Sequence, residues 1–371
     1  MPNLSLLIKP VSGACNLRCR YCFYLDESAR RQTACFGTMS ETTLQTLVRR
    51  AFAYADGPVS FAFQGGEPLL AGKSFYRQVL ALQKQYNTRC LPVTNALQTN
   101  GTLLDDDWAE LFAQGQFLVG ISLDGPASLH DRYRVDAAGA ATHARALQGA
   151  ELLKKHGVPY NILCVVTQQI AAAPDTVFDA LAPHGYLQFI PCLDALDGQP
   201  GEFSLQPEAY GRFLVRTFDR YEGAWHSGRP VSIRAFDNWV GMLLGHPPES
   251  CGMSGRCGHY YVIEADGSVY PCDFYVLDEW NLGNINDTSF FKLANSPLGT
   301  EFRRLSIPLP ESCHACPYLA LCRGGCRRER EPFVGTAPGS NRLCAGVRLF
   351  FDQRLSRLQQ LAREVADRRI N

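Results

Sequence analysis

Apolar residues in the first 230 positions alternate between short β-rich runs and longer stretches with helical spacing. The runs predict strands near 5–10 and at 59–63, 91–99, 117–123, 160–166 and 187–193. The stretches between and after them predict helices over 41–55, 74–86, 105–114, 142–156, 174–182 and 207–227. A strand followed by a helix, repeated six times, predicts parallel strands joined by right-handed crossovers. Six units are too few to close an eight-stranded barrel, so the sequence predicts an α/β fold with a partial, open (β/α)6 barrel.

The pattern changes after residue 230, where glycine, cysteine and turn residues replace helical periodicity up to about residue 345. The stretch "HYYVIEADGSVYPCDF" alternates apolar and polar residues around Asp266-Gly267, which predicts a β-hairpin. The last stretch has the spacing of an amphipathic helix. We therefore expect a barrel domain over 1–234, a cysteine-rich domain over 235–345 and a C-terminal helix over 346–371.

Four motifs follow four predicted strands of the barrel. They are "CNLRCRYC" (15–22), "QGGEP" (64–68), "QTNGT" (98–102) and "SLDGP" (122–126). Taken singly, their glycines are typical of tight turns between a strand and a helix. Because ligands of parallel α/β sheets bind at the carboxyl ends of the strands, the four motifs together predict one site.

Composition narrows the class of protein. Lys+Arg and Asp+Glu both number 36, and a net charge of zero argues against a nucleic-acid or anionic-membrane partner. The N-terminal sequence lacks the features of a signal peptide, and no run of eighteen apolar residues is present. We therefore expect a cytoplasmic protein whose 15 cysteines are reduced and available as metal or cluster ligands.

Cys15, Cys19 and Cys22 follow the first predicted strand with the spacing C-x3-C-x2-C. Cysteine thiolates bind the irons of iron–sulfur clusters, and short spacers let one loop wrap around a cube-shaped cluster. Three thiolates leave one iron without a protein ligand, and an open coordination position is typical of a metal site that does chemistry. A zinc site completed by a distant ligand, or a set of structural cysteines, is the alternative.

A second set of cysteines lies in the last third of the chain. It contains Cys251, Cys257, Cys272, Cys313, Cys316, Cys322, Cys326 and Cys344. Eight cysteines suffice for two fully ligated four-cysteine clusters, which suit electron transfer or structure, and two zinc sites are the alternative. Of the other cysteines, Cys164 and Cys192 are predicted to be small buried apolar residues, and Cys35 and Cys90 have no assigned role.

These motifs resemble a known family. "CNLRCRYC", with an aromatic residue at Tyr21, is similar to the signature of radical S-adenosylmethionine enzymes, and the later cysteines resemble the SPASM extension that carries auxiliary clusters. More narrowly, the chain from residue 4 to about 345 resembles the anaerobic sulfatase-maturating enzymes. The segments that carry this resemblance are "LSLLIKP", "CNLRCRYCFY", "FAFQGGEP", "LQTNGT", "FLVGISLDGP", "NILCVVT", "SVYPCDFYVLD", "LGNI" and "CRGGCRR".

The resemblance implies three 4Fe–4S clusters and S-adenosylmethionine as cofactors. It implies that a 5′-deoxyadenosyl radical removes hydrogen from Cβ of an active-site Cys or Ser in a sulfatase polypeptide, which ends as Cα-formylglycine. The implied partners are a sulfatase with a C/S-x-P-x-R motif and an electron donor such as flavodoxin or ferredoxin, and the implied state is a monomer. The protein would position the cofactors and exclude side reactions.

The resemblance also implies site residues. Tyr21 and Leu193 would contact the adenine, Gly66 the methionine amino group, and Ser122 and Arg134 the ribose and carboxylate region. From the sequence alone, Arg134 could equally be an ordinary surface charge, and Ser122 could be a helix cap.

Asp273 in "YPCDFY" matches the family's general base, next to a predicted cluster ligand, although a turn carboxylate is the alternative from sequence alone. Tyr24 and Gln64 are expected to line the pocket. In the same mapping the nearer auxiliary cluster takes Cys251, Cys257, Cys272 and Cys326, and the farther one Cys313, Cys316, Cys322 and Cys344. Spacing alone would group Cys326 with Cys313, Cys316 and Cys322.

Three other functions fit parts of the pattern. A related SPASM enzyme could form thioether or carbon–carbon crosslinks in a ribosomal peptide. A protein with several clusters could serve only as an electron carrier, or the cysteines could bind zinc in an interaction protein. The sequence leaves open whether the substrate residue is Cys or Ser, which sulfatase carries it, which protein donates electrons and the oligomeric state.

Overall fold

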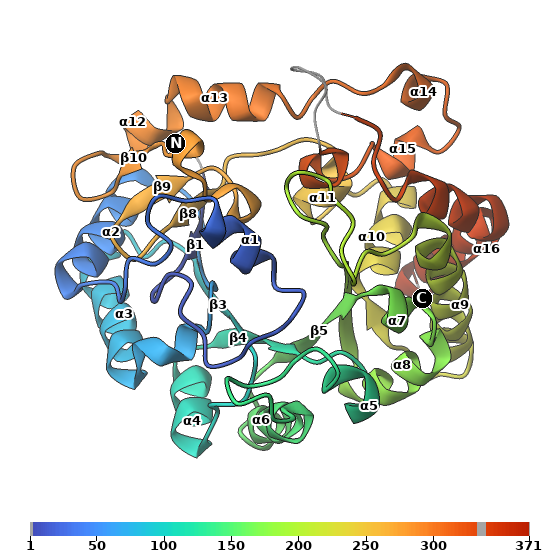
Figure 1. Ribbon diagram of the computed structural model, residues 1–371, viewed down its shortest axis with the longest axis horizontal. Coiled ribbons are helices and arrows are strands. Elements are labelled where there is room, and N and C mark those ends of the chain that lie inside the picture. Colours follow the sequence, from blue (N-terminus) through green and yellow to red (C-terminus); the bar gives the residue numbers. More distant parts are fainter. Residues whose placement is uncertain (1–2, 332–338, 371) are drawn as a thin grey trace. The chain divides into compact units, whose positions relative to one another are not determined.

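The computed structural model describes residues 3–331 and 339–370, and the chain divides into two compact units (Figure 1). The first unit comprises Met1–Ser122, Asp131–Tyr160 and His259–Phe302. The second comprises Leu123–His130, Asn161–Gly258 and Arg303–Asn371. The predicted domain boundaries at 234 and 345 stay predictions.

The first unit is built on a sheet with the strand order β10-β9-β8-β1-β2-β3-β4. Its strands are β1 (Leu4–Ile8), β2 (Val59–Phe63), β3 (Val93–Thr99), β4 (Phe117–Ser122), β8 (Tyr261–Ile263), β9 (Ser268–Tyr270) and β10 (Gly283–Asn284). Strands β8, β1, β2, β3 and β4 pair parallel with their neighbours in this order, as helical crossovers require. On the other side of β8, the pairs β8–β9 and β9–β10 are antiparallel. The late hairpin therefore extends the sheet that the N-terminal strand begins.

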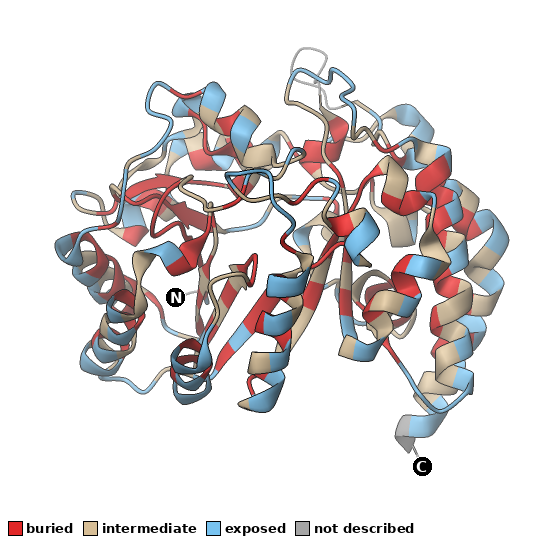
Figure 2. Cartoon of the chain, turned by 60° about the horizontal axis from the view of Figure 1, so that its bottom comes forward, coloured by how far each residue is buried: buried red, intermediate tan, exposed pale blue. Residues whose placement is uncertain are grey.

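Helices cover this sheet and contribute buried stripes to its core. They are α1 (Phe23–Ala29), α2 (Glu41–Tyr54), α3 (Lys73–Tyr86), α4 (Asp106–Gln114), α6 (His143–Lys155) and α12 (Phe290–Ala294), with the short helices η1 (Pro68–Ala71), η3 (Asp273–Tyr275) and η4 (Asp278–Trp280). Ser40 and Asp105 cap α2 and α4 by accepting backbone N–H bonds. Tyr76 of α3 is fully buried against Phe63 of β2 and Phe117 of β4. Buried residues concentrate on the strands and on the sides of the helices that face them (Figure 2).

The second unit contains the parallel strands β5 (Tyr160–Val166), β6 (Tyr186–Pro191) and β7 (Ser232–Ile233). Its helices are α5 (Ala127–His130), α7 (Gln168–Ala171), α8 (Pro174–Leu181), η2 (Ala182–His184), α9 (Pro207–His226), α10 (Arg234–Leu243), α11 (Cys251–Ser254), α14 (Glu311–His314), α15 (Leu319–Cys322), η5 (Arg327–Arg330) and α16 (Cys344–Ile370); α13 (Pro297–Arg304) begins in the first unit.

The long helix α16 runs beside α9 in the second unit (Figure 1). The two backbones approach closely at Gly346, where a Cβ atom would stand 2.0 Å from the carbonyl oxygen of Pro207. Phe218 and Phe350 pack edge to face with ring centroids 5.6 Å apart, and Arg354 donates to Asp219 at 2.8 Å. Apolar packing and ion pairing together fix the C-terminal helix that the sequence predicts.

The predicted alternation of strands and helices is confirmed, with small shifts at the ends of elements. The hairpin around Asp266-Gly267 is also confirmed, because β8 and β9 pair antiparallel and Gly267 has a φ of +92°, which favours glycine. The sequence analysis missed α1, which directly follows Cys22 and carries site residues, and α10. None of the helices that the structure describes combines the length and hydropathy that crossing a bilayer requires.

Candidate active site

Cys15, Cys19 and Cys22 lie together in the first unit. All three are half-buried and line a cavity of about 350 Å³, to which Gly66 and Tyr24 also contribute. Cys22 is the N-cap residue of α1, and its N–H donates to the carbonyl oxygen of Cys19 at 3.2 Å. The loop therefore presents three thiols to one cavity.

Hydrogen-bond donors point at the sulfur atoms of this loop. The N–H of Leu17 lies 3.3 Å and Nδ2 of Asn100 lies 3.9 Å from Sγ of Cys15. Burial raises the pKa of Cys15 to about 11, with smaller contributions from the charges of Glu67 and then of the other two cysteines, while the hydrogen bond from the N–H of Leu17 opposes the rise. A metal must therefore displace the thiol proton, and the surrounding donors then stabilise the thiolate. This donor set fits an iron–sulfur cluster.

The thiols of the described residues do not converge on a single point. In residues 3–331 and 339–370, no group of three or more His, Cys, Asp and Glu side chains could hold one metal ion. Each thiolate of a cube-shaped cluster binds a different iron, so the ligands of a cluster stand apart around it.

Arg134 is buried beside the cysteine loop, with 7 % of its surface exposed. Its Nη1 lies 3.9 Å from Sγ of Cys19, and its guanidinium lies 5.3 Å from the ring centroid of Tyr21. The alternative of an ordinary surface charge is therefore wrong. Tyr21 and Arg134, which come from distant parts of the sequence, are neighbours in the first unit.

The loop after β2 packs against the cysteine loop at Gly66. A Cβ atom on Gly66 would stand 2.0 Å from the carbonyl oxygen of Ala14, and its φ is +49°, so a larger residue would force the two loops apart. The next residue, Glu67, is fully buried and accepts hydrogen bonds from the hydroxyl of Thr99 at 2.8 Å and from the N–H of Asn100 at 2.8 Å. "QGGEP" and "QTNGT" are thus joined to the cysteine loop.

Ser122 ends β4, and its hydroxyl receives a hydrogen bond of 3.0 Å from Nε2 of Gln98. It caps no helix in the part of the chain that the structure describes. Leu193 lies in the loop after β6 in the second unit, and hydrogen bonds hold the residues on either side of it, Cys192 and Asp194. The guanidinium of Arg342 donates to the carbonyl oxygen of Cys192 and, at 3.2 Å, to Asp194.

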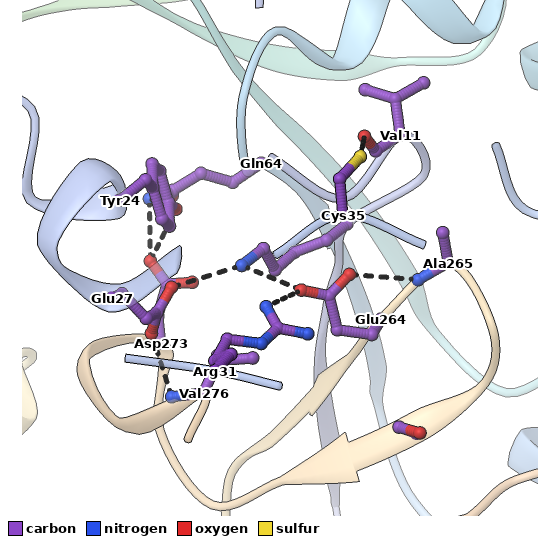
Figure 3. Close-up of polar contacts among 12 residues, drawn as sticks. Val11, Tyr24, Glu27, Arg31, Cys35, Gln64, Glu264, Ala265, Asp273 and Val276 are labelled. Atoms are coloured by element: carbon purple, nitrogen blue, oxygen red, sulfur yellow. Dashed lines mark hydrogen bonds and ion pairs between the residues drawn. The ribbon is translucent and has the colours of Figure 1, made fainter. Parts of the chain in front are cut away.

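Asp273 begins η3, directly after Cys272, and only 7 % of it is exposed. Its Oδ2 accepts hydrogen bonds from the hydroxyl of Tyr24 at 2.7 Å and from Nε2 of Gln64 at 3.1 Å (Figure 3). Its Oδ1 has no hydrogen-bond partner among the described residues. Burial raises the pKa of Asp273, while the positive charge of Lys9 and the Tyr24 hydrogen bond oppose that rise. A buried carboxylate with one free oxygen is suited to accept a proton.

The remaining cysteines of the second unit influence one another in two sets. Burial raises the pKa of Cys326 to about 12, and the thiol of Cys251, the carboxylate of Glu329 and the thiol of Cys257 add to the rise. In contrast, burial followed by the thiols of Cys344, Cys313 and Cys316 raises the pKa of Cys322. Two of the three cysteines that the resemblance groups with Cys326 thus act on its pKa, and the grouping itself stays a prediction. Cys272 belongs to the first unit; Cys164 and Cys192 are buried, and Cys35 and Cys90 are exposed.

Comparison with known proteins identifies the family. Residues 10–177 match the Radical SAM superfamily, and residues 251–317 match an iron–sulfur cluster-binding domain. The chain is 43% identical over 369 residues to the Cysteine-type anaerobic sulfatase-maturating enzyme of Clostridium perfringens, covering 98% of this chain and 100% of that protein. It is 34% identical to the Serine-type enzyme of Klebsiella aerogenes, covering 97% of this chain and 87% of that one.

This chain belongs to the anaerobic sulfatase-maturating enzymes. A solved structure of the native family member anSMEcpe, with bound AdoMet and Cp18Cys peptide, superimposes with a TM-score of 0.94 at 42% identity and covers 98% of this chain and 100% of that one. The partial α/β barrel with a SPASM region, predicted from sequence, is therefore confirmed. Streptococcus suis SuiB, at 16% identity and a TM-score of 0.65, shares only the fold.

In this sulfatase-maturating enzyme a network of buried charges, which sequence analysis missed, lies behind Asp273. Nζ of Lys9 lies 3.1 Å from Glu264 and 3.4 Å from Glu27, and Nη1 of Arg31 lies 2.7 Å from Glu264. All four side chains are nearly inaccessible to solvent. The only signal in the sequence is a lysine or glutamate at the end of an otherwise apolar strand, in "LLIKP" and "YVIEADG".

The charges in this network affect one another's pKa values. Burial raises the pKa of Glu27 to about 7, although Lys9 opposes the shift. Burial also disfavours ionisation of Glu264, but the charges of Lys9 and Arg31 hold its pKa below the usual value. The network therefore places a compensated positive charge beneath the carboxylate of Asp273.

Proposed function

We propose that this enzyme oxidises the active-site cysteine of a sulfatase polypeptide to Cα-formylglycine. Support for a cysteine substrate comes from relatives: the three Cysteine-type enzymes are 42–43% identical to this chain, against 34–35% for the Serine-type enzymes. The observation that carries the proposal is the position of Tyr24. Its side chain lines the cavity of the three cysteines and also donates to Asp273, so a proton acceptor stands beside the proposed cluster site.

The proposed cofactors are three 4Fe–4S clusters and S-adenosylmethionine. Cys15, Cys19 and Cys22 would hold the first cluster. The auxiliary clusters would be held by Cys251, Cys257, Cys272 and Cys326, and by Cys313, Cys316, Cys322 and Cys344. When bound and reduced, the first cluster and S-adenosylmethionine supply the 5′-deoxyadenosyl radical.

Asp273 is the proposed general base. The substrate cysteine would lose a hydrogen atom from Cβ to the 5′-deoxyadenosyl radical, its thiol proton to Asp273 and one further electron to the auxiliary cluster that Cys272 helps to hold, which leaves a thioaldehyde. Water then replaces the sulfur, giving the aldehyde and hydrogen sulfide. Oδ1 of Asp273 takes the proton, while Tyr24 and Gln64 hold Oδ2 and so fix the orientation of the carboxylate.

The proposed contacts to S-adenosylmethionine follow the family resemblance. Tyr21 and Leu193 contact the adenine, Gly66 the amino group, and Ser122 and Arg134 the ribose and carboxylate region. The position of Gly66 supports this, since it lines the cavity of the three cysteines and its missing Cβ lets its loop pack directly against the cysteine loop. The burial of Arg134, with only 7 % of its surface exposed, supports its assignment, because a buried guanidinium requires anionic or hydrogen-bonding partners.

The proposed macromolecular partners are a sulfatase polypeptide with the motif C/S-x-P-x-R and an electron donor such as flavodoxin or ferredoxin. Solved relatives support the first, because anSMEcpe has been crystallised with the Cp18Cys and Kp18Cys peptides. A monomeric state and a cytoplasmic location complete the proposal.

Anaerobic turnover with dithionite, S-adenosylmethionine and the paired peptides CxPxR and SxPxR tests this function by mass spectrometry. We expect the mass of the CxPxR peptide to change by exchange of CH2SH for CHO. Asp273→Asn should still cleave S-adenosylmethionine but yield no formylglycine, and normal product from this variant would exclude Asp273 as the base. If the cysteine peptide loses only hydrogen and gains a thioether or carbon–carbon bond, the enzyme is instead a crosslinking member of the SPASM group.

A further inference from the structure

Positive charge is concentrated around the loop that carries Cys15, Cys19 and Cys22. The segments 15–22 and 131–136 contain four arginines and two aspartates, although the whole chain has equal numbers of basic and acidic residues. The two segments lie side by side in the first unit, because the N–H groups of Arg18 and Arg20 donate to the carbonyl oxygens of Val135 and Tyr133 at 2.8 and 3.0 Å.

Three of these arginines are exposed and held in place. Nη1 of Arg18 donates to the carbonyl oxygen of Cys15 at 2.7 Å. The guanidinium groups of Arg20 and Arg132 lie 6.0 and 5.4 Å from the ring centroid of Tyr133, which is itself buried. Cation–π contacts and backbone hydrogen bonds thus hold positive charge at the surface of the cysteine loop.

The acidic residues of the two segments are engaged elsewhere. Oδ1 of Asp131 accepts the N–H groups of Thr142 and His143, both at 2.8 Å, at the start of α6. Asp136 forms an ion pair of 2.9 Å with Arg145. The surface formed by Arg18, Arg20 and Arg132 therefore carries an excess of positive charge, and we call it the arginine surface.

We propose that the arginine surface is the docking site of an acidic one-electron carrier protein that reduces the cluster held by Cys15, Cys19 and Cys22. This inference rests on the proposed function, since it requires a redox-active cluster in that loop. Electron transfer slows steeply with distance, so the donor must dock against the loop that wraps the cluster, and the arginine surface is part of that loop. Electrostatic complementarity accelerates formation of such small, transient complexes.

Charge also disfavours binding of the substrate motif at this surface. The substrate motif C/S-x-P-x-R contains an arginine, which the three guanidinium groups would repel. An acidic electron carrier, by contrast, gains favourable interactions with each of them. The arginine surface thus fits the donor and not the substrate.

The test compares two ways of reducing the same enzyme. Formylglycine formation by the cluster-loaded Arg20→Glu/Arg132→Glu variant is measured with dithionite and, separately, with NADPH, flavodoxin reductase and flavodoxin. At low ionic strength we expect the flavodoxin-supported rate to fall by about tenfold or more, while the dithionite-supported rate stays within about twofold of wild type. The difference should shrink at high salt, because salt screens exposed charges. Arg77→Glu on α3, also exposed, is the matched control and should leave both rates unchanged.

Equal flavodoxin-supported rates in the wild type and the double variant would overturn the docking site. If the Glu variant does not retain its iron, the charge-neutral Arg20→Gln/Arg132→Gln variant takes its place, and an unchanged flavodoxin-supported rate again overturns the proposal. Failure of the wild type to make formylglycine with dithionite would instead contradict the proposed function. Stopped-flow oxidation of flavodoxin hydroquinone by the enzyme measures docking independently of product.

Discussion

The hydroxyl of Tyr24 donates a 2.7 Å hydrogen bond to Oδ2 of Asp273, across 249 positions of the sequence. Tyr24 lies in α1, which begins directly after Cys22, and Asp273 begins η3, directly after Cys272. The bond therefore joins the cysteine loop at one end of the chain to the cysteine-rich region at the other. It also orients the proposed base beside the cavity of the three cysteines.

Replacing Tyr24 by Phe removes this hydrogen bond and the one that Gln64 donates to the Tyr24 hydroxyl, and leaves the bond from Gln64 to Asp273. Because hydrogen bonds to charged groups are worth about 1.5–3 kcal/mol, we expect formylglycine formation to slow by about tenfold to a hundredfold. The bond lowers the pKa of Asp273, so the acidic limb of the pH–rate profile should move to higher pH in the variant. Cleavage of S-adenosylmethionine is the control, and a pH profile identical to wild type would contradict a role for Tyr24 in tuning the base.

Replacing Lys9 by Met should destabilise the protein strongly. Lys9 is 1 % exposed and pairs with the buried carboxylates of Glu264 and Glu27; in the variant Glu27 would lose this cation, while Glu264 would keep its pair with Arg31. Breaking a buried ion pair costs about 3–5 kcal/mol. We expect a correspondingly lower free energy of unfolding, measured by denaturant titration at pH 7. Lys73→Met is the matched control: it removes an ion pair with exposed carboxylates, and its effect should stay below about 1 kcal/mol.

Stability should depend on pH through Glu67. Burial raises the pKa of Glu67 to about 7, so the folded protein binds a proton more tightly than the unfolded chain does. The contribution of protonated Glu67 to the free energy of unfolding is therefore complete below the unfolded pKa near 4.5, and it is lost as the pH rises through about 7. Between pH 5 and 8 wild type should lose about 3 kcal/mol of unfolding free energy relative to Glu67→Gln, which cannot ionise. Parallel stability curves for the two proteins would show that Glu67 ionises normally.

Arg342 should control the affinity for S-adenosylmethionine without touching it. Its guanidinium lies 2.7 Å from Glu329 and also donates to Cys192 and Asp194, which flank Leu193 of the proposed adenine contact. Arg342→Met should raise KM for S-adenosylmethionine by about tenfold and change kcat less, because it loosens a binding loop. Arg216→Met, which removes an exposed pair with Asp175, is the control. An unchanged KM in a variant with full iron content would refute the positioning role.

Much of the chemistry could be predicted before the structure was known. The spacing of Cys15, Cys19 and Cys22 predicts an incomplete cluster site because short spacers constrain a loop locally, whatever the rest of the chain does. The alternation of strands and helices predicts the barrel for the same reason, since periodicity reports which face of each element is buried. These features depend on residues that are close in sequence.

Tertiary structure alone decided which distant groups meet. The local sequence was compatible with an exposed Arg134, but the fold buries its side chain beside Cys19 and Tyr21. Likewise, spacing grouped Cys326 with its sequence neighbours, whereas in the fold the distant Cys251 and Cys257 act on its pKa together with Glu329.

The buried network around Lys9 was invisible in the sequence for a physical reason. From sequence alone, a lysine at a strand end is expected to be exposed, because the carboxylates that could pair with it come from other elements. Here Glu27 of α1 and Glu264 at the end of β8 form ion pairs with Lys9. The sequence by itself thus determined the elements, the cysteine loop and the class of chemistry. The tertiary structure determined which charges compensate one another, because that depends on long-range contacts that no local pattern encodes.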